Sequence, residues 1–432
     1  MSWRTTALRS VAEVSLGRQR APEYVEGRTT VPYLRAANVL DGRLDLSDVQ
    51  RMSVTPTERR LYSLRPGDVL VTEGSGSINS VGASAVWQGE IDGTVCFQNT
   101  LLRLRPRQGL DGRFLAWWAR SAFASKQFAS VATGASIYHL SAERVRSLPI
   151  TFPSLDEQAK IADFLDGETQ RIERLIQLRR HQQELLTERA ASRITAAIRG
   201  ASIPGKRGNS RIDWIGDIPA TWDVAPVSSQ FDVKLGKQLN PGRVEGSHLK
   251  PYLRNVNVQW DNVVVEDLLY MNFPPHEGAR YQVRPGDLLI CEGGEPGRAA
   301  IWQGELDEIY YQKALHRARS RGRSLTRWLF YCLRAASAVD VFTSGGNTTT
   351  IAHLTSEQLN SQRFPFPDTE IQAHIVKELD EAAQSDRKLL AVLRRQVALL
   401  QERRQAVIST AVEGGIHPST SSRRLSRRAV TA

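Results

Sequence analysis

The sequence predicts an α+β protein in which two similar mixed α/β domains are separated by two long helices. The helices are expected to form an antiparallel coiled coil, which gives the chain a pseudo-two-fold axis. Three observations predict this fold class: the chain contains an internal repeat, short β-rich runs lie between Pro-Gly and glycine-rich turns, and two long segments lack proline. The 432 residues leave room for two or three domains, each with its own core.

The internal repeat keeps its order along the chain. PYLRAANV (Pro32–Val39) returns as PYLRNVNV (Pro251–Val258), with six of eight residues identical. LRPGDVLVTEG (Leu64–Gly74) returns as VRPGDLLICEG (Val283–Gly293), with seven of eleven identical. Later blocks, DEQAKIADFLD and EIQAHIVKELD among them, return at a smaller offset, so the first copy has the longer Gly/Ser loop. Two domain-sized copies indicate a duplicated domain and not a solenoid.

The first part of each copy predicts short strands, a helix and a polar loop. The runs DVLVTEG and DLLICEG are β-rich and follow a Pro-Gly turn. A helix is expected around Asp111–Ser130 and around the equivalent Leu325–Val341. A Gly/Ser/Thr loop follows, and a short strand then ends at a proline in Leu148–Pro153 and in Arg363–Pro367.

The second part of each copy predicts a long helix, Leu155–Ile198 or Thr369–Val412. At 1.5 Å per residue each helix spans roughly 65 Å, more than an ordinary globular helix. Apolar residues step by three and four, as in a coiled-coil seam. The expected seam is Leu390, Leu393, Val397, Leu400, Arg404 (a charged interruption), Val407 and Ala411 in the second helix, and Ile172, Leu175, Ile176, Leu178, Leu185, Leu186, Ile194 and Ile198 in the first. The alternative is a surface helix packed on its own domain.

The charge balance favours a nucleic-acid partner. Lys plus Arg total 57 against 46 acidic residues, so the net charge is +11 and the pI about 9.8. No apolar run has the length of a membrane span or a signal-peptide core, so no membrane partner is expected. Three cysteines lie far apart without a CxxC, which argues against a disulfide scaffold or a thiolate metal site and favours a reducing cytoplasm.

The predicted domains are a first globular domain (1–153), a first helix (154–200), a linker (201–213), a second globular domain (214–367), a second helix (368–415) and a basic tail (416–432), which is expected to be disordered. The basic Gly/Pro-containing stretch GASIPGKRGN allows a turn after the first helix, so the second helix runs back antiparallel. Because DNA has local two-fold axes and the two heads differ in sequence, this layout predicts an asymmetric target with two half-sites.

Several segments resemble the specificity subunits of type I DNA restriction–modification systems. They are the LRPGD and VRPGD runs with their following Glu-Gly, the helix entries FPSLDEQAKIADFLD and FPDTEIQAHIVKELD, and WIGDIPATWDV (Trp214–Val224). The second entry reads EIQ where the family usually has EQ. The resemblance covers nearly the whole chain.

The resemblance implies a non-catalytic subunit with two target recognition domains that bind double-stranded DNA. In this family the helices separate the domains, and two methyltransferase (modification) subunits and motor–nuclease (restriction) subunits bind. No cofactor is implied for this chain, whereas S-adenosylmethionine, ATP and magnesium are expected in the partner subunits. The competing hypothesis is a diverged, stand-alone DNA methyltransferase or nuclease.

The residues argue against that enzyme. The nearest string to the Asn/Asp-Pro-Pro-aromatic segment of adenine methyltransferases is Asn272-Phe273-Pro274-Pro275, in the wrong order. No GxxxxGK[ST] phosphate loop and no Glu-x-Lys of a PD–ExK nuclease occur. His139 and His353 lack a neighbouring cysteine or paired carboxylate, so packed or DNA-facing histidines are favoured over a catalytic or metal role. Glu73 and Glu292 are better explained as caps of glycine-rich turns than as general bases.

Base-reading residues are expected where the repeats are built alike but differ in side chains. The candidates are Ser75, Ser77, Asn79 and Arg298 in the glycine loops, and Ser136, Tyr138, His139, Asn347, Thr349, Thr350 and His353 in the later polar loops. A second set is shared by both copies and cannot distinguish two half-sites. These residues, Arg35, Asn38, Arg254 and Asn257, are expected to contact phosphate or to be purely structural. The tail (419–428) is basic enough to touch phosphate without sequence preference.

Overall fold

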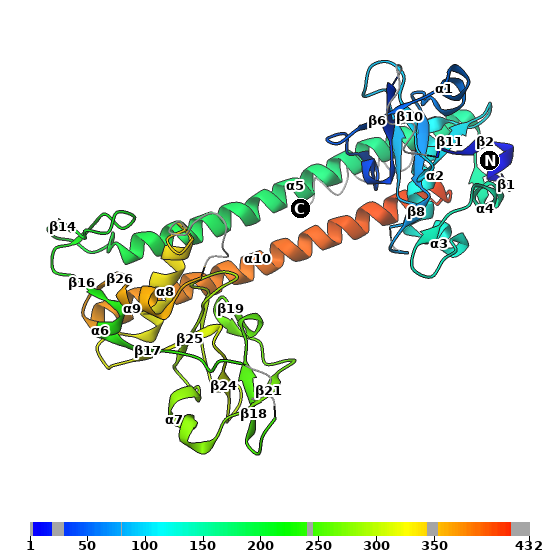
Figure 1. Cartoon of the computed structure of the whole chain (residues 1–432). Coiled ribbons are helices and arrows are strands. Elements are labelled where there is room, and N and C mark those ends of the chain that lie inside the picture. Colours follow the sequence, from blue (N-terminus) through cyan, green and yellow to red (C-terminus); the bar gives the residue numbers. More distant parts are fainter. Residues whose placement is uncertain (1–2, 20–29, 79, 240–244, 344–352, 416–432) are drawn as a thin grey trace. The chain divides into compact units, whose positions relative to one another are not determined.

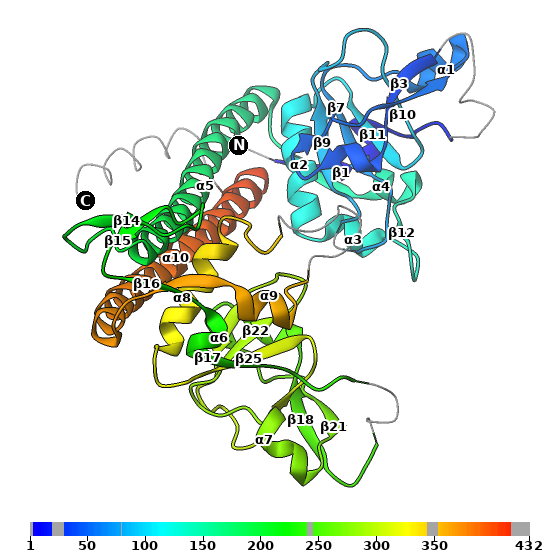
Figure 2. The ribbon, with the colours of Figure 1, turned by 60° about the vertical axis from the view of Figure 1, so that its left-hand side comes forward.

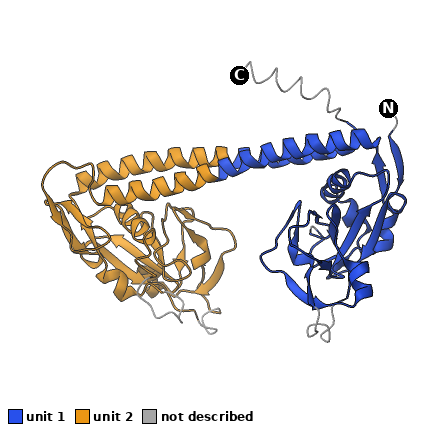
Figure 3. Cartoon of the chain, turned by 90° about the horizontal axis from the view of Figure 1, so that it is seen from above, with its two compact units in different colours: residues 1–180, 394–432 blue, residues 181–393 orange. Residues whose placement is uncertain are grey.

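The computed structural model describes residues 3–19, 30–78, 80–239, 245–343 and 353–415 (Figure 1). The chain forms two compact units: unit 1 comprises residues 1–180 and 394–432, and unit 2 comprises residues 181–393 (Figure 3). Each unit holds the globular part of one copy of the repeat and about half of each long helix. The predicted scheme treated the helices as separate segments, whereas here both helices are divided between the units.

Unit 1 is built on a four-stranded antiparallel sheet and a mixed three-stranded sheet. In spatial order these are β2 (Ala12–Leu16), β11 (Leu101–Pro106), β7 (Asp68–Thr72) and β9 (Ser84–Trp87), then β10 (Cys96–Phe97), β3 (Thr30–Leu34) and β6 (Gln50–Ser53). Smaller pairs are β1 (Arg4–Ala7) with β13 (Pro149–Phe152), β4 (Val39–Leu40) with β5 (Arg43–Leu44), and β8 (Gly74–Ser75) with β12 (Tyr138–His139). The short α-helices are α1 (Pro56–Tyr62), α2 (Gly112–Ala124), α3 (Gln127–Val131) and α4 (Ala142–Ser147).

Unit 2 repeats this plan. Its four-stranded sheet is β17 (Phe231–Leu235), β25 (Leu315–Ser320), β22 (Leu288–Cys291) and β23 (Ala299–Ile301), and its three-stranded sheet is β21 (Leu269–Asn272), β18 (Leu249–Leu253) and β24 (Tyr310–Tyr311). Smaller pairs are β16 (Asp223–Pro226) with β26 (Arg363–Phe366), β19 (Val258–Gln259) with β20 (Asn262–Val263), and β14 (Arg207–Asn209) with β15 (Asp217–Pro219). The short α-helices are α6 (Val227–Gln230), α7 (Gly278–Tyr281), α8 (Thr326–Ser337) and α9 (Ser356–Ser361). Figure 2 shows β18 and β21 beside α7, at the end of this unit away from α8.

The two units share strand register as well as strand order. Leu70 of β7 lies opposite Arg103 of β11, and the equivalent Leu289 of β22 lies opposite Arg317 of β25. Both arginines are buried, and each is paired with an acidic side chain of the neighbouring edge strand. A shared register, with a buried arginine paired to a carboxylate of the edge strand in both units, confirms that the repeat is a structural duplication.

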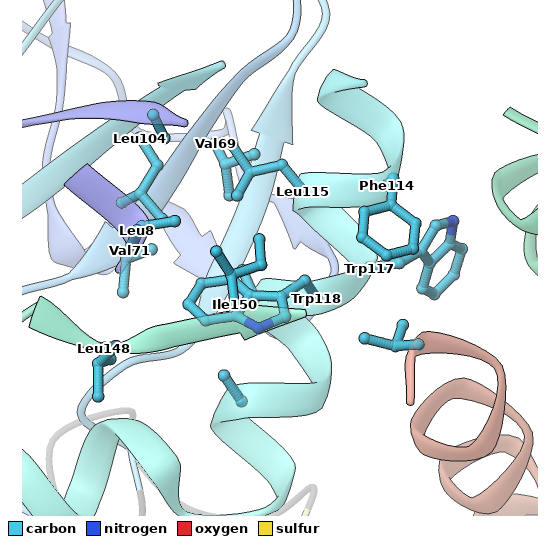
Figure 4. Packing of buried hydrophobic residues seen from close by; sticks show 14 of the residues in the cluster. Leu8, Val69, Val71, Leu104, Phe114, Leu115, Trp117, Trp118, Leu148 and Ile150 are labelled. Carbon is cyan, nitrogen blue, oxygen red and sulfur yellow. The ribbon is translucent and has the colours of Figure 1, made fainter. Parts of the chain in front are cut away.

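The core of unit 1 lies between its four-stranded sheet and α2 (Figure 4). Asp111 caps α2, because its carboxylate accepts hydrogen bonds from the backbone amides of Arg113 and Phe114. Leu115 then faces Val69 of β7. The prediction of one helix through Ser130 was wrong: Lys126 adopts φ 64°, which ends α2, and α3 begins at the next residue.

The long helices have the predicted limits: α5 is Leu155–Ile198 and α10 is Thr369–Val412. In unit 1 the start of α5 (Ile161, Leu165) shares a core with the end of α10 (Ile408, Ala411), and in unit 2 the end of α5 (Ile194, Ile198) shares one with the start of α10 (Ile375, Leu379). The helices therefore pack antiparallel within each unit. No described helix combines the length and apolar character that a membrane span requires.

Only part of the expected seam is buried. Ile172, Ile176, Leu186, Ile194, Ile198, Leu393 and Ala411 are buried, whereas Leu390, Val397, Leu400, Arg404 and Val407 are half-buried. The seam assignment of Leu175, Leu178 and Leu185 was wrong, because these side chains are exposed. A spacing of three or four cannot distinguish the buried stripe from an adjacent apolar stripe.

A buried glutamine joins each long helix to its domain. The Gln158 side chain accepts a hydrogen bond from the Asp111 amide at 2.7 Å and donates to the carbonyls of Gly109 and Pro153. Gln372 makes equivalent contacts with the Leu325 amide and the Pro367 carbonyl. These are the glutamines of the two helix-entry motifs, so the EIQ variant keeps the residue that makes the connection.

The predicted linker contains a strand. Arg207–Asn209 forms β14, which pairs with β15 in unit 2. The Arg207 guanidinium donates to the carbonyls of Gly200, Arg199 and Asp217, which anchors the segment against the end of α5.

Candidate nucleic-acid interface

In unit 1 the fold brings the two expected reading loops together. The glycine loop leaves β7 and forms β8, and the later polar loop forms β12, which pairs antiparallel with β8. Ser75 therefore lies opposite Tyr138, and Gly74 lies opposite His139. Ser77, Ser136 and His139 are exposed, whereas Ser75 and Tyr138 are half-buried. Asn79 lies outside the described residues.

His139 is held by a carboxylate. Its Nδ1 atom lies 3.1 Å and 3.2 Å from the two carboxylate oxygens of Glu73, and its side chain is 53% exposed. Because a carboxylate only accepts hydrogen bonds, Nδ1 carries a proton, which leaves Nε2 as the ring nitrogen that can contact another partner. A ring nitrogen placed in this way can hydrogen-bond to a base edge in the major groove. Glu73 was expected only to cap a turn, so its role as the partner of His139 was missed.

Unit 2 has the same backbone frame. The Leu354 amide donates to the Glu292 carbonyl at 2.6 Å, as the Leu140 amide donates to the Glu73 carbonyl at 2.7 Å. His353, which precedes Leu354, is exposed, so it has a position equivalent to that of His139. Asn347, Thr349 and Thr350 lie outside the described residues.

A second histidine of unit 2, His316, holds the loop around Leu354 from the core side. The His316 ring is buried in β25, and its Nε2 donates to the Leu354 carbonyl at 2.7 Å. Burial lowers the pKa of His316, which favours the neutral ring at neutral pH. The repeat places Leu102 at the equivalent position, so this polar substitution in a core strand was a signal available in the sequence.

Arg298 does not point freely from the second glycine loop. Its guanidinium donates to the Asn255 carbonyl at 3.1 Å and lies 3.3 Å from the Glu295 carboxylate. The Asn255 side chain also donates to the Gly293 carbonyl at 2.7 Å, which ties the glycine loop to the shared segment. Arg298 could reach a base only by exchanging these contacts, so the structure gives it a loop-shaping position that the sequence had not predicted.

The four shared residues form one motif in both units. Asn38 ends the 3₁₀ turn η3 (Ala36–Asn38) and Asn257 ends the equivalent η5 (Asn255–Asn257); both are buried. Each side chain accepts from the backbone amide of the arginine three residues earlier; Asn38 then donates to two backbone carbonyls further along, and Asn257 donates to one. Burial of these asparagines and their hydrogen bonds to the backbone fit the structural alternative.

The shared arginines remain at the surface. Arg35 pairs with Asp48 at 2.5 Å, and the Arg254 guanidinium donates to the backbone carbonyl of Asp267 at 2.7 Å. Both guanidinium groups are thus oriented before any ligand binds, while both side chains stay partly exposed. This arrangement fits a phosphate contact, which needs a cation in a fixed place but no sequence information.

Unit 1 also has a polar cleft of about 700 Å³ beneath the β4–β5 hairpin. Its lining is Asp41, Gly42, Arg43, Arg120, Asp166, Thr169, Gln170, Glu173, Gln177, Arg180 and Arg404. In unit 2 the equivalent hairpin carries Trp260 and Asp261 in place of Asp41 and Gly42. Asp261 is bound there by Arg327 and Arg387.

No group of three or more potential metal ligands occurs among the residues that the structure describes. The thiols are inert by burial, which raises the pKa of Cys96 and of Cys291 to about 11, and that of Cys332 well above its usual value. The described part of the chain thus offers surface loops with hydrogen-bonding side chains on a rigid scaffold.

The sequence model of the type I restriction modification DNA specificity domain matches residues 2–185. The chain is 26% identical over 214 residues to the StySPI specificity subunit of Salmonella potsdam, a match that covers 46% of this chain and 45% of that protein. It is 22% identical over 386 residues to the EcoKI specificity subunit of Escherichia coli, covering 87% and 80% of the two chains.

Two solved structures share the fold. A chain from a study of assembly and conformational transition in a type I restriction–modification system superposes with a TM-score of 0.73 at 18% identity, covering 96% of this chain and 98% of that one. The HsdS subunit of Thermoanaerobacter tengcongensis gives 0.55 at 21% identity, with 96% and 97% coverage. The family model matches residues 2–185, the duplication gives unit 2 the same fold, and the chain is thus similar to the specificity subunits of type I restriction–modification systems over most of its length.

Proposed function

We propose that this chain selects the DNA target of a type I restriction–modification complex, with each recognition domain reading one half of an asymmetric two-part sequence. One observation carries the proposal: the two units share their scaffold down to strand register but differ in the loops that follow β7 and β22. A shared scaffold supports a shared mode of docking, and different loops support different half-sites. The net charge of +11 favours association with the phosphate backbone.

The helices are proposed to set the spacing between the half-sites. Both α5 and α10 pass from one unit into the other without a break, and the buried Gln158 and Gln372 fix each helix entry to its domain. A continuous helical connection of this kind would favour one separation of the bound half-sites over its neighbours.

The helices are also proposed to dock two methyltransferase subunits. Unit 1 exposes Leu175 and Leu178 of α5 with Leu399 of α10, and unit 2 exposes the repeat-equivalent Leu389 and Val392 of α10 with Leu185 of α5. Each unit thus exposes three apolar side chains at equivalent positions on exchanged helices. Two equal apolar sites favour two copies of one partner. The motor–nuclease subunits would join the same complex.

A reconstitution assay tests this function. With its modification subunit and S-adenosylmethionine, the chain should direct methyl transfer to one asymmetric two-part sequence, and alone it should transfer none. Leu178→Glu combined with Val392→Glu should abolish methyl transfer and co-purification of the modification subunit, whereas Leu61→Glu, at an exposed leucine of α1, should leave both unchanged. Turnover by the chain alone would support the stand-alone enzyme instead.

The same reconstitution addresses the cofactors. S-adenosylmethionine, ATP and magnesium are proposed to act in the partner subunits. Equilibrium dialysis of the isolated chain against each should give no saturable binding, and saturable binding of S-adenosylmethionine to the chain alone would contradict this part of the proposal.

A further inference from the structure

The two long helices correspond residue by residue, because α10 repeats α5 at an offset of 214 over their whole length. Such a repeat would allow each helix to pair with the same helix of a second copy of the chain. If the two seams were equivalent, α5 could pair with α5 of a second copy, and α10 with α10, in the register seen here. Either product would join two identical recognition domains. We infer that charged residues at the helix interface encode pairing of α5 with α10 and disfavour both self-pairings.

Three close ion pairs join α5 to α10. In unit 1, Glu173 of α5 accepts from Arg404 of α10 at 3.0 Å. In unit 2, Asp386 of α10 accepts from both Arg189 and Arg193 of α5, the former at 3.0 Å. Asp386 is only 7% exposed, so its charge needs these partners.

The repeat shows what a pair of α5 helices would contain. In α5, Ile172 stands where α10 has Asp386, and it is itself buried at 2% exposure. Arg189 and Arg193 would therefore face an isoleucine of the second copy and lose their carboxylate. Glu173 would face Ala190, which is the counterpart of Arg404. The longer 4.0 Å contact of Glu168 with Arg403 would survive, as Glu168 with Arg189.

A pair of α10 helices would be disfavoured differently. The counterpart of Glu173 in α10 is Arg387, so Arg387 would face Arg404 of the second copy, twice in the symmetric pair. Asp386 would keep Arg403, the counterpart of Arg189, but would meet Val407 in place of Arg193. Like charges in contact and a half-satisfied buried carboxylate both oppose this pairing.

Polar residues in a helix seam are a known means of fixing partner and register. Here the charged residues of α5 find opposite charges on α10, and neither helix finds the full set on a second copy of itself. The inference concerns only contacts within the units and does not depend on DNA binding, so it stands or falls separately from the proposed function.

Fragment exchange in the folded protein tests it. A protease site inserted between Pro204 and Gly205, in the exposed stretch after α5, allows the intact chain to be nicked into two fragments that remain associated. Two nicked populations, with different tags on the first fragment and different isotope labels throughout the chain, are mixed and warmed until second fragments exchange between them. Retrieval of one tag should then recover the foreign second fragment at least about tenfold more than the foreign first fragment, a ratio equal to about 1.4 kcal/mol. Equal recovery would overturn the inference.

A variant that allows α5 to pair with α5 tests whether the ion pairs themselves cause the selectivity. Ile172→Asp gives α5 the carboxylate of α10, which Arg189 and Arg193 of a second copy can bind. Foreign first fragments should now be recovered at a level comparable with second fragments. Adding Arg189→Gln and Arg193→Gln to Ile172→Asp should remove that recovery again. If Ile172→Asp changed nothing, the ion pairs would not be the source of selectivity.

Discussion

His139 illustrates what the sequence can and cannot reveal about a single residue. Its place in a loop that differs between the repeats predicted a DNA-facing histidine, and the structure places it at the exposed β12–β8 pair. The hydrogen bond to Glu73 could not be predicted, because it joins loops 66 residues apart. For Asn38 and Asn257 the sequence left two roles open. An identical residue in both copies was as consistent with a phosphate contact as with a turn, and their burial favours the turn.

Two loop histidines, His139 and His353, are predicted to contact bases. His139→Ala should relax discrimination in the first half-site only, at a cost of about 1–3 kcal/mol on matched DNA, because a base contact is lost. His353→Ala should do the same in the second half-site. The reconstituted complex would be titrated on duplexes mismatched in one half at a time. Equal loss of affinity on all duplexes would indicate that these residues only shape their loops.

Glu73→Ala tests whether the orientation of the His139 ring contributes to discrimination. It leaves His139 in place but removes the carboxylate that orients the ring. Discrimination in the first half-site should fall to an intermediate level, while Glu357→Ala, at an exposed carboxylate in unit 2, should leave it unchanged.

At the scale of elements, the helix limits were predictable and the helix contacts were not. Absence of proline and the apolar spacing gave α5 and α10 their observed ends. The same spacing assigned Leu178 to the seam, although the structure exposes it. The pairing of Asp386 with Arg189 and Arg193 depends on how two distant segments align, which local periodicity does not encode.

Asp386 gives this pairing a pH dependence. Burial opposes its charge, but hydrogen bonds from Arg193 and Arg189 outweigh burial and lower its pKa below the ordinary value. A lowered folded-state pKa means that the contribution to stability is present at neutral pH and is lost as pH falls through that pKa, below about pH 4. Asp386→Asn should therefore lower the free energy of unfolding at pH 7 by about 1–2 kcal/mol. This value lies between those typical of exposed and of fully buried ion pairs, because Asp386 is buried while Arg189 is largely exposed.

Urea unfolding from pH 7 to pH 3 measures this effect. The difference between wild type and Asp386→Asn should shrink below about pH 4, where the wild-type carboxyl also becomes neutral. Asp307→Asn, at an exposed aspartate, serves as the matched control. A difference that stayed constant over the whole range would contradict the assigned role of the charge.

The spacing role of the helices can be tested by matched insertions. Seven residues inserted between Glu188 and Arg189 of α5, and seven between Arg387 and Lys388 of α10, leave the Asp386 pairs and the Arg387–Asp261 pair in place. The insertion adds roughly 10 Å of helix and nearly preserves the facing sides. The methylated sequence should keep both half-sites and gain about three base pairs of spacer. An insertion in α5 alone should abolish activity, and an unchanged spacer after the double insertion would contradict the spacing role.

At the scale of the whole molecule, duplication was the most informative feature of the sequence. It predicted two domains of one fold, and the equal strand registers confirm this. Only some of the differences between the units could be seen in the sequence. The substitution of Asp41-Gly42 by Trp260-Asp261 was readable from the repeat, but its consequence was not. The consequence is a polar cleft in unit 1 and an ion-pair cluster around Arg327 in unit 2, and it depends on side chains of three separate elements.

The central claim is that each recognition domain reads its own half of the target. The most direct measurement replaces Arg4–Thr151 by the equivalent segment of a related specificity subunit and maps methylated sites across the genome of a host that also carries the modification subunit. The account predicts a new first half-site with an unchanged spacer and an unchanged second half-site. A hybrid that altered both half-sites, or neither, would contradict it.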